Sequence, residues 1–279
     1  MVCFANLSIQ ETTSMALSNI MAVLNPTIEE QPAFERALVS AEMTGAGLLL
    51  YICLNDSCGN GGQQNITASY REKLEALAER AKTRKVDASI DIDWDDNWRE
   101  QVVVAAQRNK ADLIIKHSVD HGDVKRAKHS TADWTLLRQS KCPVLMIKNH
   151  TQWESRRVLA AVVDKPIDAA HEKLNQQVIG FTNDFAETYQ SEAHFVVAFQ
   201  DKNHEPDAAD IASRCKVEAG RVHVLHGQTD VVITNIASEI KADLIVIGSV
   251  GRTGIKATVV GNTSERLLDH TNCDVLVLK

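Results

Sequence analysis

The sequence predicts an α/β protein with two tandem domains, each built on a five-stranded, doubly wound parallel sheet. Three observations support this prediction. The chain has 279 residues, about twice the usual size of a domain. Two of its segments repeat one another at a fixed separation. Within each half, short apolar runs alternate with helical patterns, which is typical of βαβ units and a parallel sheet.

The repeat defines the domain organisation. Lys110–Lys148 aligns without a gap with Lys241–Lys279, and 14 of the 39 aligned residues are identical. The two segments are 131 residues apart, which is far longer than a solenoid repeat, so the repeating unit is a whole domain. We expect a polar linker over 149–156. The predicted division is an N-terminal tail over 1–18, a first domain over 19–150 and a second domain over 151–279.

The first half contains five apolar runs that predict strands, separated by four helical patterns. The run from Val86 to Trp94 alternates strictly between apolar and polar residues, which predicts a half-exposed strand at the edge of the sheet. The other runs are short and apolar, as expected of buried parallel strands. In order, the predicted elements are strand 20–24, helix 34–43, strand 48–54, helix 70–82, strand 89–94, helix 100–108, strand 113–115, helix 131–139 and strand 144–147.

The second half repeats this order of elements. Its first helix is the most regular, since Leu174, Val178, Phe181, Phe185 and Tyr189 are spaced by three or four residues and form one apolar face. In order, the predicted elements are strand 158–163, helix 168–190, strand 195–199, helix 208–217, strand 222–225, helix 231–240, strand 244–247, helix 263–270 and strand 275–278.

Composition excludes several classes of function. The net charge is −7, and neither half has the excess of Lys and Arg that binding to nucleic acid requires. No apolar run approaches the ~18 residues of a membrane span, so we expect a soluble protein. The opening segment lacks the basic start of a signal peptide. The six cysteines form no C-x-x-C pair, which favours reduced thiols and a cytoplasmic location.

A glycine-rich loop follows the predicted strand 244–247. Gly248 and Gly251 come first, and nine residues later Gly261 opens the next predicted helix. Ligands of open α/β sheets bind at the carboxyl ends of the strands. Gly248 would let the chain turn sharply off the strand, and Gly251 would let backbone N–H groups approach an anion. The loop therefore predicts a phosphate site.

Side chains around this loop strengthen the phosphate prediction. Asn262 and Gly261 would direct the N–H groups and the positive dipole end of the helix toward the anion. Arg252 would add a charge-assisted contact. Asp164, at the carboxyl end of the first strand of this half, could accept from a base or ribose, or bind Mg²⁺ through water. The simpler alternative is a plain glycine turn followed by Asn262 as a helix N-cap.

The pattern G-x2-G-x9-G together with Asp164 resembles the universal stress protein family, and the likeness covers both halves over residues 19–279. The resemblance implies Rossmann-like domains with strand order 3-2-1-4-5, ATP binding with or without Mg²⁺, and a cytoplasmic role in stress survival. This chain departs from the family pattern in two places: Asn262 stands where the family usually has Ser or Thr, and the connection over 200–221 is shorter than usual. The implied nucleotide-binding residues are Asp164, Ala198, Ile247, Gly248, Gly251, Arg252, Gly261, Asn262 and Thr263.

The first half departs from this motif at each critical position. Side chains of His117, Asp120 and Ser130 stand where the second half has glycine, and Asn25 is aligned with Asp164. These side chains would fill the space of a phosphate, and Asp120 would repel it. We expect nucleotide to bind in the second half alone. The His117–His129 stretch also holds three histidines, which we interpret as solvated surface residues rather than metal ligands.

Three functions remain open from the sequence. The first is a nucleotide-binding stress sensor or adaptor without substantial turnover, read by a protein partner that the sequence does not identify. The second is a weak enzyme that uses ATP for adenylyl or phosphoryl transfer, since a fold does not determine function. The third is a nucleotide-free scaffold for a ligand or partner. Because the halves repeat, we expect them to pack as a pseudo-dimer about an approximate two-fold axis, with a further homodimer as an option. The family resemblance implies that they meet near their final strands, Val144–Ile147 and Val275–Leu278.

Overall fold

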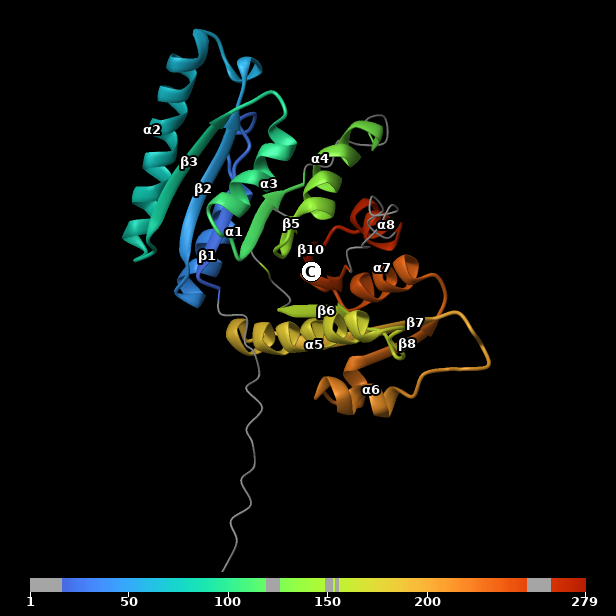
Figure 1. Ribbon diagram of the computed structural model, residues 1–279. Helices are drawn as coiled ribbons and strands as arrows, with labels where there is room; N and C mark the ends of the chain where they lie inside the picture. Colours follow the sequence, from blue (N-terminus) through green and yellow to red (C-terminus); the bar gives the residue numbers. More distant parts are fainter. Residues whose placement is uncertain (1–16, 119–125, 149–152, 154–155, 250–261) are drawn as a thin grey trace, which may run out of the picture.

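The computed structural model describes residues 17–118, 126–148, 153, 156–249 and 262–279, and for residues 126–132 and 262–265 it describes the backbone alone. All ten strands of these residues form one continuous sheet (Figure 1), in the order β3-β2-β1-β4-β5-β10-β9-β6-β7-β8. Each half of this order reads 3-2-1-4-5 within its own five strands, so the predicted topology is confirmed. The strands within each half are parallel.

The first half of the chain forms strands β1 to β5. Its predicted edge strand is β3, which pairs with β2 alone among the described strands. The bounds are β1 (Asn19–Val23), α1 (Pro32–Thr44), β2 (Gly47–Leu54), a 3₁₀ turn (Asp56–Cys58), α2 (Gly62–Thr83), β3 (Ala88–Trp94), α3 (Trp98–Arg108), β4 (Leu113–His117), α4 (Arg126–Gln139) and β5 (Val144–Ile147).

The second half of the chain repeats this sequence of elements as β6 to β10. The bounds are β6 (Arg157–Ala161), α5 (Ala169–Tyr189), β7 (Glu192–Phe199), α6 (Ala208–Cys215), a 3₁₀ turn (Ala219–Arg221), β8 (Val222–His226), α7 (Thr229–Glu239), β9 (Leu244–Gly248), α8 (Asn262–His270) and β10 (Asp274–Leu278). Asp168 caps α5 by accepting from the backbone N–H of His171 at 2.9 Å, which explains why the helix begins there.

The largest departure from the sequence prediction is the length of α2. This helix begins at Gly62, eight residues before the predicted start at Tyr70. The added turns are mostly polar, and Ile66 is their one buried residue, so the segment lacks the apolar periodicity that indicates a helix. The equivalent helix in the second half, α6, has 8 residues against 22 in α2.

The two halves join through their last strands. β5 and β10 pair in antiparallel fashion, with Leu145 opposite Leu276, Val144 opposite Val277 and Met146 opposite Val275. Leu145 and Leu276 are 131 residues apart and therefore occupy equivalent places in the repeat. An isologous contact of this kind places the approximate two-fold axis between these two leucines. The predicted contact near the final strands is confirmed.

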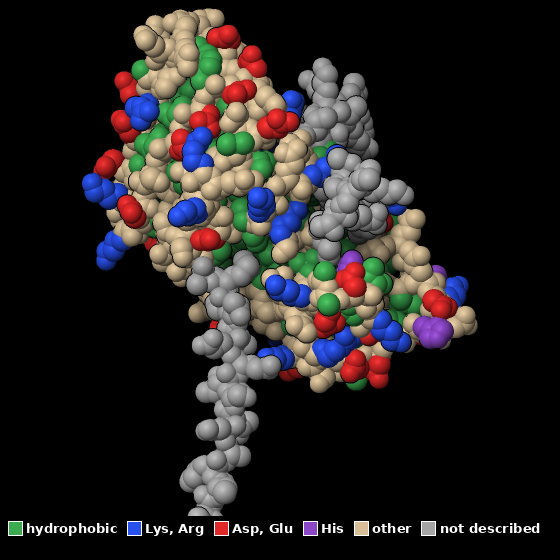
Figure 2. Space-filling view, viewed as in Figure 1, with side chains coloured by type: hydrophobic (Ala, Val, Ile, Leu, Met, Phe, Trp, Pro, Cys, Tyr) green, Lys and Arg blue, Asp and Glu red, His purple; other side chains and the backbone are tan. Residues whose placement is uncertain are grey.

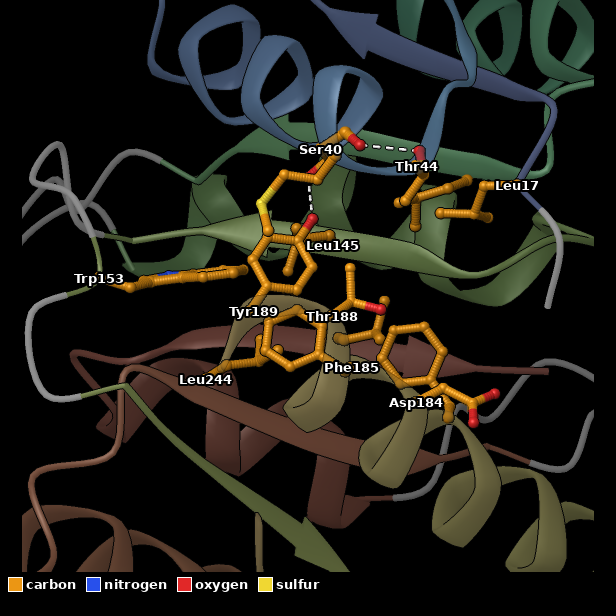
Figure 3. A pocket seen from close by; sticks show the side chains of 14 residues that line it. Leu17, Ser40, Thr44, Leu145, Trp153, Asp184, Phe185, Thr188, Tyr189 and Leu244 are labelled. Atoms are coloured by element: carbon orange, nitrogen blue, oxygen red, sulfur yellow. Dashed lines mark hydrogen bonds between the residues drawn. The ribbon is translucent and has the colours of Figure 1, made fainter. Parts of the chain in front are cut away.

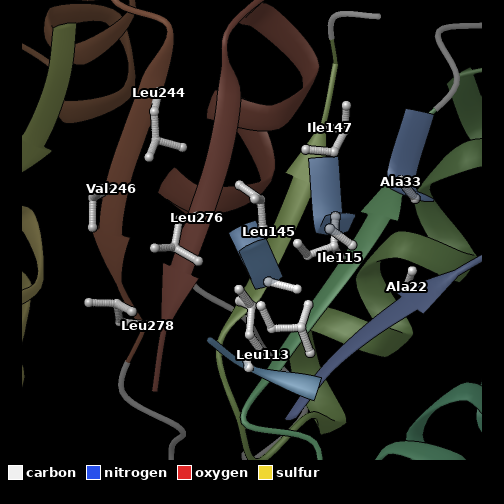
Figure 4. Packing of buried hydrophobic residues seen from close by; sticks show 14 of the residues in the cluster. Ala22, Ala33, Leu113, Ile115, Leu145, Ile147, Leu244, Val246, Leu276 and Leu278 are labelled. Carbon is white, nitrogen blue, oxygen red and sulfur yellow. The ribbon is translucent and has the colours of Figure 1, made fainter. Parts of the chain in front are cut away.

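Buried side chains form two layers, one on each face of the sheet. Leu145 and Leu276 lie in the layer covered by α1, α2, α5 and α6 (Figure 4), next to Leu113 and Leu244. The opposite layer, under α3, α4, α7 and α8, includes Val144. Because alternate residues of a strand point to opposite faces, the nearly continuous apolar strands supply both layers at once.

Charged side chains of both signs intermingle on the face of the molecule that Figure 2 presents, with no broad basic area among them. In the part of the chain that the structure describes, every helix is too short or too polar to cross a lipid bilayer.

Candidate functional site

The carboxyl ends of β6 and β9 lie side by side in the sheet, because these strands pair in parallel from Val158 opposite Leu244 onward. This edge holds the described part of the predicted nucleotide site. Gly251, Arg252 and Gly261 lie outside the described residues, as do the side chains of Asn262 and Thr263. The backbone of Asn262 begins α8, one residue before the predicted helix start.

The segment that follows β6 is held in place by α5. The Val163 backbone N–H donates to Asn175 Oδ1 at 2.8 Å, and Asn175 Nδ2 donates to the Val163 carbonyl at 3.1 Å. Asn175 is buried, so this pair of hydrogen bonds satisfies its amide within the protein. The next residue, Asp164, thus follows the carboxyl end of β6, the strand that pairs with β9.

Arg214 of α6 holds the Asp164 carboxylate. Arg214 Nη2 donates to Asp164 Oδ1 at 2.8 Å, and Arg214 Nη1 donates to the Asp164 carbonyl at 3.0 Å. The same guanidinium contacts Asp210 through Nε at 3.2 Å. Asp164 keeps 22% of its side-chain surface exposed, so its second carboxylate oxygen can accept a hydrogen bond from a ligand. The short 200–221 connection thus supplies a charged contact to the site. Residue spacing in the sequence gave no sign of it.

Gly248 is glycine because α5 approaches the end of β9 closely. A Cβ on Gly248 would lie 2.7 Å from Leu174 Cγ and 2.8 Å from its Cδ2. The sequence-based expectation was a sharp turn off the strand, but Gly248 still pairs with Leu278 in the ladder and its φ is not left-handed. The constraint is therefore steric. The Ser249 N–H then donates to the Leu278 carbonyl at 2.9 Å, which extends the strand end by one residue.

Ala198 and Ile247 lie on the other face of the sheet from Gly248. Ile247 is 5% exposed and belongs to the layer under α7 and α8, and Ala198 packs partly buried against the same layer. Ala198 is the next-to-last residue of β7, so it is also near the carboxyl edge. Because its side chain is buried, Ile247 could reach a ligand only through its backbone. The structure thus does not bring these two side chains together with Asp164.

The equivalent edge of the first half contains a polar network. Lys116 Nζ contacts Asp133 Oδ1 at 2.7 Å, and Ser118 Oγ donates to Asp133 Oδ2 at 2.7 Å. The Lys116 and Asp133 side chains are only 14% and 13% exposed. Burial opposes ionisation of Asp133, but the Lys116 ammonium and both hydrogen bonds outweigh it, so the pKa of Asp133 is lowered. The end of β4 therefore carries an ion pair whose charges and hydrogen-bonding groups already satisfy one another.

Two sequence-based expectations for the first half need correction. Ile20 of β1 pairs with Leu113 and Val158 of β6 pairs with the equivalent Leu244, so Asn25 is equivalent to Val163. Both residues donate their backbone N–H to a side-chain amide oxygen. Pro26 therefore stands where the second half has Asp164. His117 ends β4 and is 8% exposed, so it is a buried residue rather than a solvated one. It was misassigned because β4 extends two residues beyond the predicted strand end.

No three His, Cys, Asp or Glu side chains converge on a possible metal position within the described ranges. A cation at the carboxyl edge of the second half would have Asp164 as its protein ligand among these residues, and one oxygen of that carboxylate is already bound by Arg214. The donor set does not make a metal site by itself. It fits Mg²⁺ only as a partner of nucleotide phosphates.

Comparison with known proteins identifies the family. The sequence profile of the universal stress protein family matches twice, over residues 17–148 and 158–279. The chain belongs to the universal stress protein family. The predicted membership and the tandem arrangement of the two family units are both confirmed.

The likeness to several relatives spans nearly the whole of both chains. Universal stress protein E of Escherichia coli K12 is 25% identical over 295 residues, which cover 94% of this chain and 93% of that protein. The universal stress protein E homologue of Haemophilus influenzae is 24% identical and covers 95% of this chain and 98% of its own. Among solved structures, PA1789 of Pseudomonas aeruginosa PAO1, described as functionally unknown, superposes with a TM-score of 0.80 at 27% identity, covering 95% and 93% of the two chains.

A universal stress protein of Archaeoglobus fulgidus superposes with a TM-score of 0.74 at 16% identity, covering 95% of this chain and 98% of its own. At this identity the likeness concerns the fold alone. It establishes that the ten-stranded arrangement does not depend on close sequence similarity.

Proposed function

We propose that the second half of this universal stress protein binds ATP at the carboxyl edge of β6 and β9. In this proposal the protein acts in the cytoplasm as a stress-response sensor or adaptor that hydrolyses little ATP. A protein partner recognises whether nucleotide is bound. Asp164 would accept from the base or ribose. The backbone of the Gly248–Gly261 loop and the start of α8 would take the phosphates, with Arg252 adding charge and Mg²⁺ accompanying the phosphates.

The contrast between the two strand ends is the main support for this proposal. At the end of β9, Gly248 carries no side chain and stays exposed, and Asp164, which follows the neighbouring strand β6, keeps a partly exposed carboxylate. At the equivalent end of β4, His117 is buried at the position of Gly248, and its neighbours Lys116 and Ser118 both bind the buried Asp133 carboxylate. The exposed backbone at Gly248 suits the approach of an anion, whereas the ion pair beside His117 already satisfies its own charges.

Arg214 adds to the proposal by orienting Asp164. Its two hydrogen bonds hold both the carboxylate and the backbone carbonyl of Asp164, which reduces the conformational freedom that a ligand would otherwise have to remove. Exposed apolar side chains follow the same strand edge, with Val163 at 51% and Ile167 at 82% exposure. They offer apolar surface on which an adenine ring could lie.

Isothermal titration of the full chain with Mg·ATP tests the proposal. We expect one ATP per chain, and we expect Gly251→Asp to abolish binding because it places a carboxylate at the phosphate position. Gly220→Asp is the matched control, since a Cβ at Gly220 meets nothing within 4 Å and this glycine precedes β8 at the opposite edge of the sheet. Two ATP per chain, or unchanged binding by Gly251→Asp, would refute the proposed site.

A further inference from the structure

A cavity of about 360 Å³ lies between the two halves, away from the proposed nucleotide edge (Figure 3). Its floor is formed by two pairs of repeat-equivalent leucines, Leu113 with Leu244 and Leu145 with Leu276. The cavity therefore straddles the approximate two-fold axis. Its volume is in the range of sites that bury small molecules.

The cavity exists because the two repeats differ at equivalent helix positions. Two residues separate the end of α1 from β2, and two separate the end of α5 from β7. β2 and β7 begin at equivalent places beside β1 and β6, so Ser40 is equivalent to Phe185 and Thr44 to Tyr189. The first half presents small hydroxyl side chains where the second half presents aromatic rings. Two small side chains facing two large ones leave space that a symmetric pair of aromatic helices would fill.

One wall of the cavity is aromatic. Phe185 and Tyr189 stack with ring centroids 4.2 Å apart at 17°, and Phe181 continues the stack at 6.0 Å from Phe185. Trp153 meets Phe185 and Tyr189 edge-on, at 5.2 and 5.6 Å. These rings are fixed by one another, so a flat apolar molecule could bind against them with little loss of side-chain freedom.

The polar groups of the cavity are few and placed apart. The Tyr189 hydroxyl contacts Ser40 Oγ at 3.1 Å inside the cavity, as Figure 3 shows. Asp184 is the one charged side chain among the described residues that line it. In Figure 3 the Asp184 carboxylate lies on the side opposite Trp153. Met43 and Thr188 are exposed and mark the opening to solvent.

Asp184 lies near a second acid, Glu187, and near one lysine, Lys216. Burial and the neighbouring Glu187 raise the pKa of Asp184, and Lys216 partly offsets this effect. A partly desolvated carboxylate beside a second acid is stabilised electrostatically by an approaching cation and destabilised by an approaching anion.

We propose that this cavity binds a small neutral or cationic molecule with a flat apolar body, which lies against Phe181, Phe185 and Tyr189 and directs its polar end toward Asp184. The Tyr189–Ser40 hydroxyl pair can donate to or accept from one polar atom of that molecule. The site belongs to both halves together, so its occupation favours the observed pairing of the halves. It is independent of the proposed nucleotide site.

Fluorescence of the neutral probe N-phenyl-1-naphthylamine with the full chain tests the proposal. We expect saturable binding of one probe per chain, weakened roughly 10-fold or more by Thr188→Phe, which places a ring in the opening. Val104→Phe is the matched control, because Val104 is 49% exposed on α3, which covers the other face of the sheet. Gly251→Asp should bind the probe like the unaltered protein, which separates this site from the nucleotide site.

Competition against the bound probe tests the charge preference. Naphthalen-1-ylmethylammonium, a flat cation, should displace the probe at a several-fold lower concentration than the flat anion 1-naphthoate, and Asp184→Asn should remove that difference. Absence of saturable binding, equal probe affinity in Thr188→Phe, or stronger competition by 1-naphthoate would overturn the proposal. Leu17 lines the cavity, and residues 1–16 precede it in the sequence. Probe binding that appears only after their deletion would assign the cavity to the tail, and would overturn the proposal as well.

Discussion

Arg36 of α1 and Asp274 of β10 form a buried ion pair that joins the two halves of the chain. Their side chains are 3.0 Å apart, and the side chains are 10% and 0% exposed. Trp153 Nε1 donates to Asp274 Oδ2 at 2.8 Å, and the Arg36 guanidinium lies 4.0 Å from the centre of the Trp153 ring. The repeat-equivalent position of Asp274 in the first half is Pro143, so this connection has no symmetric copy.

Removing the cation from this pair should weaken the junction strongly. Arg36→Met leaves the fully buried Asp274 without its main counter-charge, and we expect a loss of about 3–5 kcal/mol in the free energy of unfolding. Urea denaturation measures the change. Arg80→Met is the control, since Arg80 pairs with Glu35 at 54% and 52% exposure and should cost about 1 kcal/mol or less. Similar losses in both variants would contradict the assigned role of Arg36.

Gly248→Ala should destabilise the protein by overpacking. The new Cβ would overlap Leu174 Cγ, which cannot move without shifting α5, and such overpacking costs about 1–3 kcal/mol. Gly180→Ala is the control because Gly180 lies within α5 with nothing within 4 Å of the added Cβ, and it should stabilise by about 0.5–1 kcal/mol. The two variants should thus shift the urea midpoint in opposite directions. A shift in the same direction would show that the approach of α5 is not what requires glycine.

Stability should fall as the pH drops below neutrality, because of a histidine pair in β7 and β8. His194 Nδ1 and His223 Nε2 are 3.3 Å apart, and burial lowers the pKa of both side chains. The unfolded chain then binds protons more readily than the folded one, so stability is kept above the ordinary histidine pKa of about 6.5 and lost as the pH falls toward the lowered values.

Denaturation at pH 7 and pH 5 measures this effect. His223→Gln should lose less stability between the two pH values than the unaltered protein does. His204→Gln should not differ from the unaltered protein, because His204 is 73% exposed and pairs with Asp201 at the surface. An unchanged pH dependence in His223→Gln would exclude the pair as its source.

ATP turnover should be slow. Phosphoryl transfer relies on cations and a group that orients the nucleophile. Around the carboxyl edge of the second half, the guanidiniums of the described residues are already paired, Arg214 with two carboxylates and Arg266 with Asp230, and no acidic cluster converges within the described ranges. Binding that does not favour the transition state does not accelerate the reaction. A steady-state assay that finds about 1 turnover per second or more, lost in Gly251→Asp, would support the alternative of an ATP-using enzyme.

Local patterns in the sequence were sufficient to predict the elements and their order. Each strand is short and apolar enough to be buried on both faces, and right-handed crossover connections then leave few arrangements for five parallel strands. The 131-residue repeat implied that one arrangement would occur twice. The eight-residue start of α2 escaped prediction because a solvent-facing polar helix has no apolar period.

Repeat and motif together indicated the proposed nucleotide edge and the difference between the two halves at Gly248 and His117. They could not show why Gly248 must be glycine, because that depends on how closely Leu174 approaches from another element. They also missed the contact of Arg214 with Asp164, since these residues are 50 positions apart and α6 carries no motif.

Tertiary structure alone decided how the halves meet. Leu145 pairs with Leu276 because the two halves join at these strands, in the antiparallel direction and in this register. Short apolar strands are compatible with several other edges, directions and registers. That choice brought α1 beside α5, where it buried Arg36 against Asp274 and left the cavity that Ser40 and Tyr189 help to line. Contacts between residues far apart in the chain follow from the packing of whole elements, and no short stretch of sequence encodes that packing.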